Sequence, residues 1–319
     1  MPAPSVSPQA GLIRRLAAWR LPLGIALVLL AFALIEPRVI SAANLRNIAV
    51  QCSYLAIFAL AQCLVILTRG FDLSLGFTVS LVSVLSAMVM VATGSAFAGV
   101  AAGLGVGLAV GLANGLLVGG IGLNPLVTTL GMANIVMSLA STVSGGFPVA
   151  GLPAAFTDGL AQAAPLGLPI QIWIVALIFA AGWAMLRATR FGRSLYIIGA
   201  NPRAAVAAGI NTFGTLTAAY VLSSLATAIG ALLLTARTGS GEPNLGGNLT
   251  LEAIAAAVVG GAKLSGGEGG VGSALLGAVF VTVLSNGMNL IQLDGYIQQI
   301  CLGAIIVISL VLSRDDLRR

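Results

Sequence analysis

Long apolar runs without any charged residue fill this chain, as in residues 97–118 and 214–235. A bilayer has a hydrocarbon core about 30 Å thick, which an α-helix of about 20 apolar residues crosses. The strands of an outer-membrane barrel would instead be alternating segments of about ten residues. Only 8% of the 319 residues are charged and 58% are apolar, which excludes an ordinary soluble domain. The sequence therefore predicts an all-α integral membrane protein.

The apolar runs divide into about ten predicted transmembrane helices, which would form one polytopic helical bundle. Their expected positions are 21–36, 47–68, 73–93, 96–118, 123–143, 169–187, 213–236, 250–263, 271–292 and 296–312. Residues 21–312 thus form a single predicted transmembrane domain between tails at 1–20 and 313–319. The apolar run after Arg20 resembles a signal peptide, but another span follows at once, which favours an uncleaved first helix.

Arginine clusters indicate the orientation, because short cytoplasmic loops of membrane proteins are rich in Lys and Arg. The clusters are Arg14, Arg15 and Arg20 before the first span, Arg187, Arg190, Arg193 and Arg203 after the sixth, and Arg314, Arg318 and Arg319 at the end. An even number of spans between them places all three on one side. We therefore expect both termini in the cytoplasm, with Arg38 and Arg46 as exceptions outside. The net charge of +6 then calls for no nucleic-acid partner.

A pattern of glycine and asparagine occurs twice with the same internal spacing. Its positions are Gly105, Asn114, Gly115 and Gly131 in the first copy, and Gly277, Asn286, Gly287 and Gly303 in the second. The first copy covers the fourth and fifth predicted spans, and the second covers the ninth and tenth. An offset of five spans is odd, so the copies must cross the membrane in opposite directions, as in transporters built from inverted repeats.

Glycine also recurs every fourth residue along the fourth predicted span. The positions are Gly99, Gly103, Gly107, Gly111 and Gly115. With about 3.6 residues per turn they form a stripe on which another helix can approach closely. Internal helix packing is the favoured interpretation, and a sliding or dimer contact is the alternative.

The segment GFDLSLG, residues 70–76, places polar groups where the second and third spans meet. Its candidate residues are Gly70, Asp72, Ser74 and Gly76, and Arg69 precedes them. One interpretation is a cytoplasmic turn in which Asp72 accepts from free amides at the start of the next helix. The other is a broken helix near a transport path, because a charge at this place needs water, a partner or a backbone cavity.

The longest polar insertion in the hydrophobic body is the cytoplasmic loop at about 187–212. Its Ala-rich part, 203–209, predicts a short amphipathic helix on the cytoplasmic face. We favour docking to a cytosolic partner over a helix resting on lipid, because Arg190, Phe191 and Arg193 offer charge and an apolar side chain. On the other side, the connection 144–168 would either receive an external binding protein or simply link two spans.

No constellation indicates catalysis or a metal. The chain has no His, and Cys52, Cys63 and Cys301 lie in apolar runs without metal-ligand spacing. GEGGVG, residues 267–272, matches the dinucleotide pattern but follows no predicted strand. The P-loop pattern is absent from the sequence, so ATP-driven transport would need a separate ATPase.

Four segments, in order and spacing, resemble the ribose-type permeases of bacterial ATP-binding-cassette (ABC) importers. They are LTRGFDLSLG (67–76), NPLVTTLG (124–131), TRFGRSLYIIGANPRAAVAAGI (189–210) and EAIAAAVVGGAKLSGGEGGVGSALLG (252–277). The resemblance runs from about residue 44 to 312. It implies a compact ten-span permease with inverted halves that moves a small neutral polar solute, foremost a monosaccharide, across the inner membrane.

The resemblance also implies partners. These are a second permease copy or close paralogue, a cytosolic ABC ATPase that uses ATP and Mg, and a periplasmic or lipoprotein solute-binding protein. This chain would itself hold no cofactor and would not be an enzyme. In such a fold, spans five and ten of both copies line the path at the dimer interface, which nominates Thr128, Thr129, Asn134 and Ser138.

In the same resemblance, the loop 189–210 is the segment that couples the permease to the ATPase. The contact would begin at Arg190, Phe191, Gly192 and Arg193, and Ala204, Ala205 and Gly209 would pack as small residues against the partner. This chain departs from the family pattern at Arg203, where an acidic residue is common, and at Arg69, where glycine is common.

The alternative from another class is an ion-coupled secondary transporter, which also uses inverted repeats. Such transporters carry ionisable groups inside the membrane. Here each Asp and Glu is predicted at or near the end of a span, with Asp72 and Glu252 as borderline cases. A passive channel would need a charge ring or filter motif, which the sequence does not show.

Overall fold

The computed structural model describes residues 8–314, and within them the chain is a bundle of helices with one isolated β-bridge between Val149 and Gly241. The long helices are α1 (Pro8–Ile35), α2 (Ala42–Ile66), α3 (Leu75–Thr93), α4 (Ala96–Gly115), α5 (Pro125–Ser144), α7 (Ile170–Ala188), α10 (Thr212–Thr238), α12 (Val271–Leu290) and α13 (Gly295–Arg314). The shorter helices are η1 (Pro37–Ile40), η2 (Leu116–Gly120), α6 (Ala154–Thr157), η3 (Asp158–Gln162), η4 (Pro165–Gly167), α8 (Arg190–Ala200), α9 (Pro202–Ala207) and α11 (Leu249–Val259). The side chains of Arg14, Arg15 and Arg314, and the whole of Arg318 and Arg319, lie outside the described residues.

Seven of the described helices are long and apolar enough to cross a membrane. They are α2, α3, α4 continued by η2, α5, α7, α10 and α12, and each matches a predicted span. The other three predicted spans coincide with shorter apolar helices, Trp19–Ile35 within α1, α11, and Gly295–Ile308 within α13. The all-α membrane fold is therefore confirmed, and the count of ten spans stays a prediction.

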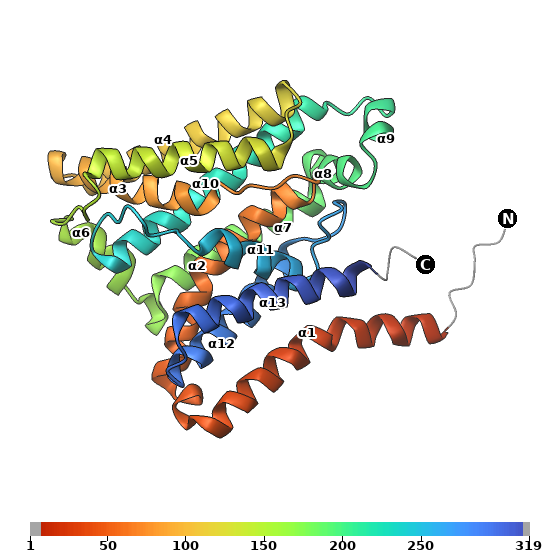
Figure 1. Cartoon of the computed structure of the whole chain (residues 1–319), viewed down its shortest axis with the longest axis horizontal. Coiled ribbons are helices and arrows are strands. Elements are labelled where there is room, and N and C mark those ends of the chain that lie inside the picture. The colour runs from red at the N-terminus through yellow and green to blue at the C-terminus, as the bar shows by residue number, and fades with distance from the viewer. Residues whose placement is uncertain (1–7, 315–319) are drawn as a thin grey trace.

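Helix α11 is only half the length of the other core helices. Its 11 residues extend about 16 Å at 1.5 Å per residue, which is less than the bilayer core. The predicted span 250–263 ends early because Gly260 and Gly261 begin a glycine-rich loop in which Gly261 has φ 106. A non-helical segment, 239–248, precedes α11 and brings the chain back into the body of the bundle (Figure 1).

Helix α2 is the central helix. Its residues from Cys52 to Ile66 are buried on every face, as expected for a helix that is apolar all round. It packs against α7, α10, α11 and α12. Helices α3, α4 and α5 form one flank, and α1 and α13 lie on the opposite side of the view (Figure 1).

The packing shows an inverted internal symmetry. Helix α10 packs on α3 and α4, and α2 packs in the corresponding way on α11 and α12. Helix α3 contacts α4 and α5, as α11 contacts α12 and α13. This pattern pairs α2–α5 with α10–α13. The start of α1 and the end of α13 lie on the side of α8 and α9 (Figure 1).

Two contacts fix the direction of the repeat. The end of α4 lies at the start of α10, where a Cβ on Gly115 would come 2.8 Å from Thr217 Cα. The loop before α12 lies at the end of α2, where Gly267 N donates to Leu67 O at 3.0 Å. Because α2 and α10 run in opposite directions (Figure 1), α4 ends on the side where α12 begins. The two copies are antiparallel, as the odd offset predicts.

The glycine stripe of α4 is an internal packing surface. All five of its glycines are buried next to α3 and α10, namely Gly99, Gly103, Gly107, Gly111 and Gly115. A Cβ at Gly107 would lie 2.6 Å from Ala228 Cβ, and one at Gly111 would lie 2.8 Å from Val221 Cα. The prediction of internal packing is confirmed, since the stripe seats α4 directly on the backbone of α10.

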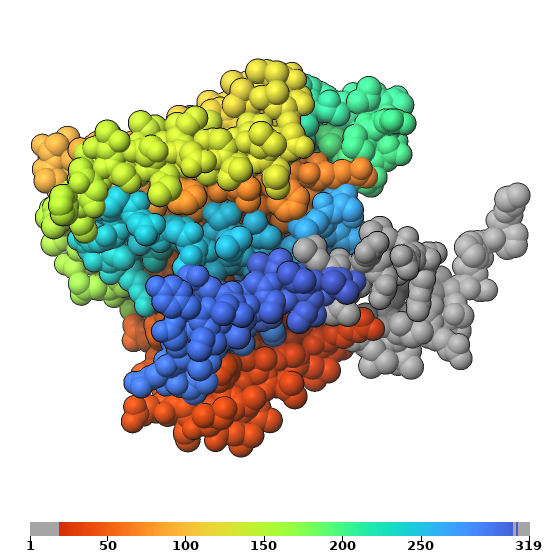
Figure 2. Space-filling model, in the orientation of Figure 1, coloured from red at the N-terminus to blue at the C-terminus, as the bar shows by residue number. Residues whose placement is uncertain are grey.

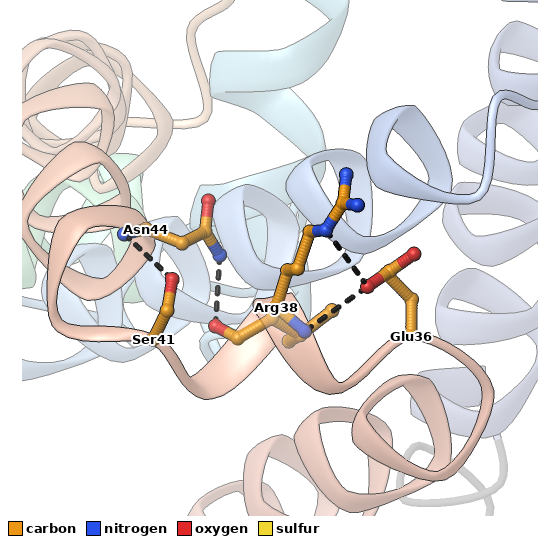
Figure 3. Close-up of polar contacts among 5 residues, drawn as sticks. Glu36, Arg38, Ser41 and Asn44 are labelled. Carbon is orange, nitrogen blue, oxygen red and sulfur yellow. Dashed lines mark hydrogen bonds and ion pairs between the residues drawn. The ribbon is translucent and has the colours of Figure 1, made fainter.

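The turn η1 joins α1 to α2 through local polar contacts (Figure 3). The Glu36 carboxylate accepts from Arg38 N at 3.1 Å and lies 3.7 Å from the Arg38 guanidinium. Ser41 Oγ accepts from Asn44 N at 3.3 Å, and Asn44 Nδ2 donates to Val39 O at 2.8 Å. Arg38, one exception to the charge rule, is therefore paired at the surface.

Candidate functional site

The turn between α2 and α3 lies inside the protein. Gly70, Asp72, Ser74 and Gly76 are all buried, and Asp72 is 3% exposed. The segment is therefore no exposed surface loop, and the choice between a cytoplasmic turn and a broken helix near a transport path stays a prediction. A Cβ at Gly70 would lie 2.8 Å from Tyr220 Oη, so the chain has no room for a side chain there.

Asp72 binds the start of α3. Its Oδ1 accepts from Ser74 N at 2.9 Å and from the Ser74 hydroxyl, so it satisfies a free amide next to a helix start. Burial raises the pKa of the Asp72 carboxyl above its ordinary value, and the bonds from Ser74 offset part of that effect. No cation pairs with Asp72 among the described side chains.

Polar residues from three further helices complete a network around Asp72. Asn114 Nδ2 in α4 donates to Ser74 Oγ at 2.9 Å. Thr129 Oγ1 in α5 accepts from Leu73 N at 3.1 Å. Tyr220 Oη in α10 donates to the carbonyl of Phe71 at 3.1 Å. We call Asp72, Ser74, Asn114, Thr129 and Tyr220 the Asp72 cluster.

The cluster brings together residues that were predicted for different reasons. Asp72 and Ser74 come from the 70–76 segment, Asn114 from the repeat and Thr129 from the expected path. Tyr220 was missed, because it lies in a long apolar run and nothing in the sequence indicates that its hydroxyl forms a hydrogen bond. The buried Asn114 Oδ1 has no partner among the described residues.

The first turns of α3 and α11 lie side by side. Gly76 N donates to Thr250 Oγ1 at 2.8 Å, and Gly246 N donates to Ser80 Oγ at 3.1 Å. A Cβ on Gly76 would collide with the carbonyl oxygen of Gly246. Two helix breaks, one from each half, therefore meet inside the bundle, an arrangement that transporters use near their substrate path.

Beside this contact, Glu252 in the first turn of α11 borders a cavity of about 270 Å³ between α11 and α13. The cavity is also lined by Asn248, Gln299 and Gly303. Glu252 was predicted at or near the end of a span, and it stands in the first turn of the short helix α11.

The remaining path candidates lie on the outer face of α5. Thr128 is half-buried, and Asn134 and Ser138 are exposed. The hydroxyl of Thr128 donates to Asn124 O at 2.9 Å, and Asn134 Nδ2 donates to Leu130 O at 3.0 Å. The structure does not join them to the Asp72 cluster. Figure 2 shows the yellow-green surface of α5 and the blue surface of α13 on the same face of the molecule.

The second copy of the repeat makes different contacts from the first. Asn286 and Asn44 exchange two hydrogen bonds of 2.9 and 3.1 Å, which join α12 to the start of α2. A Cβ on Gly287 would collide with the ring of Phe32 in α1. Asn286 and Gly287 therefore lie far along the bundle from the Asp72 cluster.

The coupling candidates lie on α8 and α9, where the sequence predicted a single short helix. Asn201 ends α8, and its side chain accepts from Ala204 N at 3.1 Å to begin α9. The exposed members are Arg190, Arg193, Arg203, Ala204 and Gly209. Phe191 is half-buried, and Gly192 and Ala205 are buried within this chain. A partner can therefore reach only some of the predicted coupling residues, because the others are covered by this chain.

Helix α8 is fastened to the membrane body at its end. The Arg69 guanidinium donates to the carbonyls of Gly199 and Ala200, in the second case at 2.7 Å. Tyr196 Oη donates to Gly269 O at 3.0 Å. Neither contact could be expected from the sequence alone.

Comparison with known proteins decides the family. Residues 44–310 match the family model described as the branched-chain amino acid transport system / permease component. The chain belongs to this permease family. No solved structure matches it.

Three relatives of this permease resemble it over nearly their whole length. The ribose import permease protein RbsC of Escherichia coli (strain K12) is 33% identical over 296 residues, which are 90% of this chain and 91% of the relative. The galactose/methyl galactoside import permease protein MglC of the same strain is 34% identical over 306 residues, 90% and 91% of the two chains. The autoinducer 2 import system permease protein LsrD of Enterobacter sp. (strain 638) is 35% identical over 313 residues, 94% and 95%. The resemblance to ribose-type permeases is confirmed.

Proposed function

We propose that this permease is the membrane-spanning subunit of an ABC importer that carries a monosaccharide, or a similarly small neutral polar solute, across the bacterial inner membrane. The similarity to ribose and galactose permeases along nine-tenths of the chain carries the proposal. Nothing among these relatives favours the ion-coupled alternative.

The proposed partners follow from the surfaces. A cytosolic ATPase, using ATP and Mg, would dock on the exposed arginines of α8 and α9. A second copy or close paralogue would cover the common face of α5 and α13, on which large apolar side chains such as Val127, Ile135 and Ile300 are exposed. A solute-binding protein would deliver the solute at the opposite end, and both termini would lie on the ATPase side.

A neutral solute fits the proposed path better than an ionic one. Helix α5 and the stretch Gly295–Ile308 of α13 contain no charged residue. An anion, a cation or a zwitterionic amino acid leaving water would need compensating charges. Hydroxyl groups of a sugar would instead meet Asn134, Ser138 and Gln299, which are all exposed.

In the proposed mechanism, ATP binding closes the ATPase sites and displaces α8 and α9. The displacement tilts the paired helices, so that the path opens alternately to each side. The broken helices α3 and α11 are the proposed moving elements, because their starts meet inside the bundle, and discontinuous helices form the substrate sites of many transporters.

The experiment tests docking on α8 and α9. The purified permease is mixed with the ABC ATPase proposed as its partner, and co-purification and solute-stimulated ATP hydrolysis are measured. Arg193→Glu with Ala204→Leu, both at exposed positions, should abolish assembly and stimulation. The control Arg38→Glu changes an exposed arginine at the opposite end and should leave both intact. Unaltered assembly of the double variant would refute the docking surface.

A further inference from the structure

Arg69 occupies a backbone conformation that side chains disfavour. Its φ is 64°, in the left-handed region where a non-glycine residue is strained. Glycine would adopt it freely. The contacts of the Arg69 side chain can offset this strain.

The side chain of Arg69 caps a helix that is remote in sequence. Nη2 donates to Ala200 O at 2.7 Å and Nε donates to Gly199 O. These are the last two residues of α8, and carbonyls at a helix end have no intrahelical amide. A cation there also interacts favourably with the helix dipole. A planar guanidinium can reach both carbonyls at once.

The junction around Arg69 is closely packed. A Cβ on Gly199 would collide with Leu67 O, and one on Gly266 would collide with Arg69 Cγ. Gly267 N donates to Leu67 O at 3.0 Å. The end of α8 therefore rests on the backbone of the α2–α3 turn and of the α11–α12 loop, without intervening side chains that could yield.

We propose that Arg69 is a positioning residue that fastens α8 to the α2–α3 turn, so that displacement of α8 by the ATPase reaches the Asp72 cluster and α3. The inference rests on the proposed function. Only two residues separate Arg69 from Asp72, so the turn cannot extend far when α8 is displaced, and Asp72 must move with it. Without the hydrogen bonds of Arg69, α8 moves independently of the turn, and ATP is hydrolysed without transport.

The test uses the complete importer in proteoliposomes and measures ATP hydrolysed per solute delivered. Arg69→Gly removes both hydrogen bonds to α8 and the strain together, and the ratio should rise about threefold to tenfold, the range for partly exposed charge-assisted hydrogen bonds. Assembly with the ATPase and Tm should be retained. Arg69→Lys should recover part of the coupling, and Arg69→Met, which keeps the stem without a donor, should not.

The control is Gln292→Gly, which relieves the same kind of strain at φ 58 and should leave the ratio unchanged. An unchanged ratio in Arg69→Gly, or full coupling in Arg69→Met, would overturn the inference while the proposed function stands. Loss of assembly in Arg69→Gly would also overturn it, because Arg69 would then contact the ATPase directly. Failure of the wild-type permease to bind any ATPase would refute the proposed function instead.

Discussion

Two glycines on the same helix provide a direct test of how α4 is seated. Gly105 and Gly111 are both inside α4, and each is replaced by alanine. An added methyl raises helix propensity by up to about 1 kcal/mol relative to glycine, and this gain is common to both variants. The difference between them therefore isolates packing.

The geometry sets the expected difference. Nothing lies within 4 Å of a Cβ at Gly105, whereas one at Gly111 would lie 2.8 Å from Val221 Cα and from Ser224 Cβ. Carbon atoms prefer a separation of about 3.5–4.0 Å, so α10 must move by roughly 1 Å. Overpacking of this kind costs about 1–3 kcal/mol. Gly105→Ala should be as stable as the wild type or slightly more stable. The free energy of unfolding of Gly111→Ala should be about 1–3 kcal/mol lower than that of Gly105→Ala.

The assay is equilibrium unfolding of the purified permease in mixed detergent micelles, titrated with a denaturing detergent and followed by circular dichroism. The free energies of unfolding of both variants are compared at one micelle composition. Equal values, or a lower value for Gly105→Ala, would show that the α4–α10 contact does not depend on the missing side chains, and the packing argument would fail.

Two other predictions concern the buried turn and the direction of the repeat. Since burial places the folded pKa of Asp72 above its ordinary 3.8, the folded state holds this proton more tightly, and stability should fall as pH rises from about 4 towards the raised pKa. Asp72→Asn should remove that part of the pH dependence in the same unfolding assay; parallel curves would contradict it. With the native cysteines replaced, single cysteines at Ile121, 69% exposed beyond α4, and Tyr296, 78% exposed beyond α12, should react with a membrane-impermeant maleimide from opposite faces. Reaction from one face would refute the inverted arrangement.

The sequence was sufficient for the long helices and their antiparallel copies, because apolar length and loop charge report directly on membrane crossing. The division into two helices at Asn201 and Pro202 was missed, since we predicted one helix there, although Asn before Pro is a typical helix start. The sequence was not sufficient for the burial of the 70–76 segment. Glycines around a charged residue are typical both of an exposed turn, whose backbone binds water, and of a buried turn, whose backbone binds a side chain such as Tyr220. Only the tertiary structure distinguishes the two.

The length of α11 could not be predicted either. Leucine and alanine continue the helical pattern up to the glycine pair, and hydropathy alone extends the span beyond it. The helix stops at this pair, where Gly261 takes φ 106 and Gly260 lies so close to α12 that a Cβ would collide with Ser273 O. Hydropathy does not report the backbone conformation of a glycine, so it does not reveal this boundary.

The contact between Gly76 and Gly246 limits how the two halves of the permease can evolve and move. A methyl group at either glycine would push the other backbone away, so the two positions form one unit although they belong to different copies of the repeat. The bonds to Thr250 and Ser80 on either side of the contact hold the two backbones in register. The halves therefore meet where each interrupts its own helix, and a side chain added to one half has to be accommodated by the other.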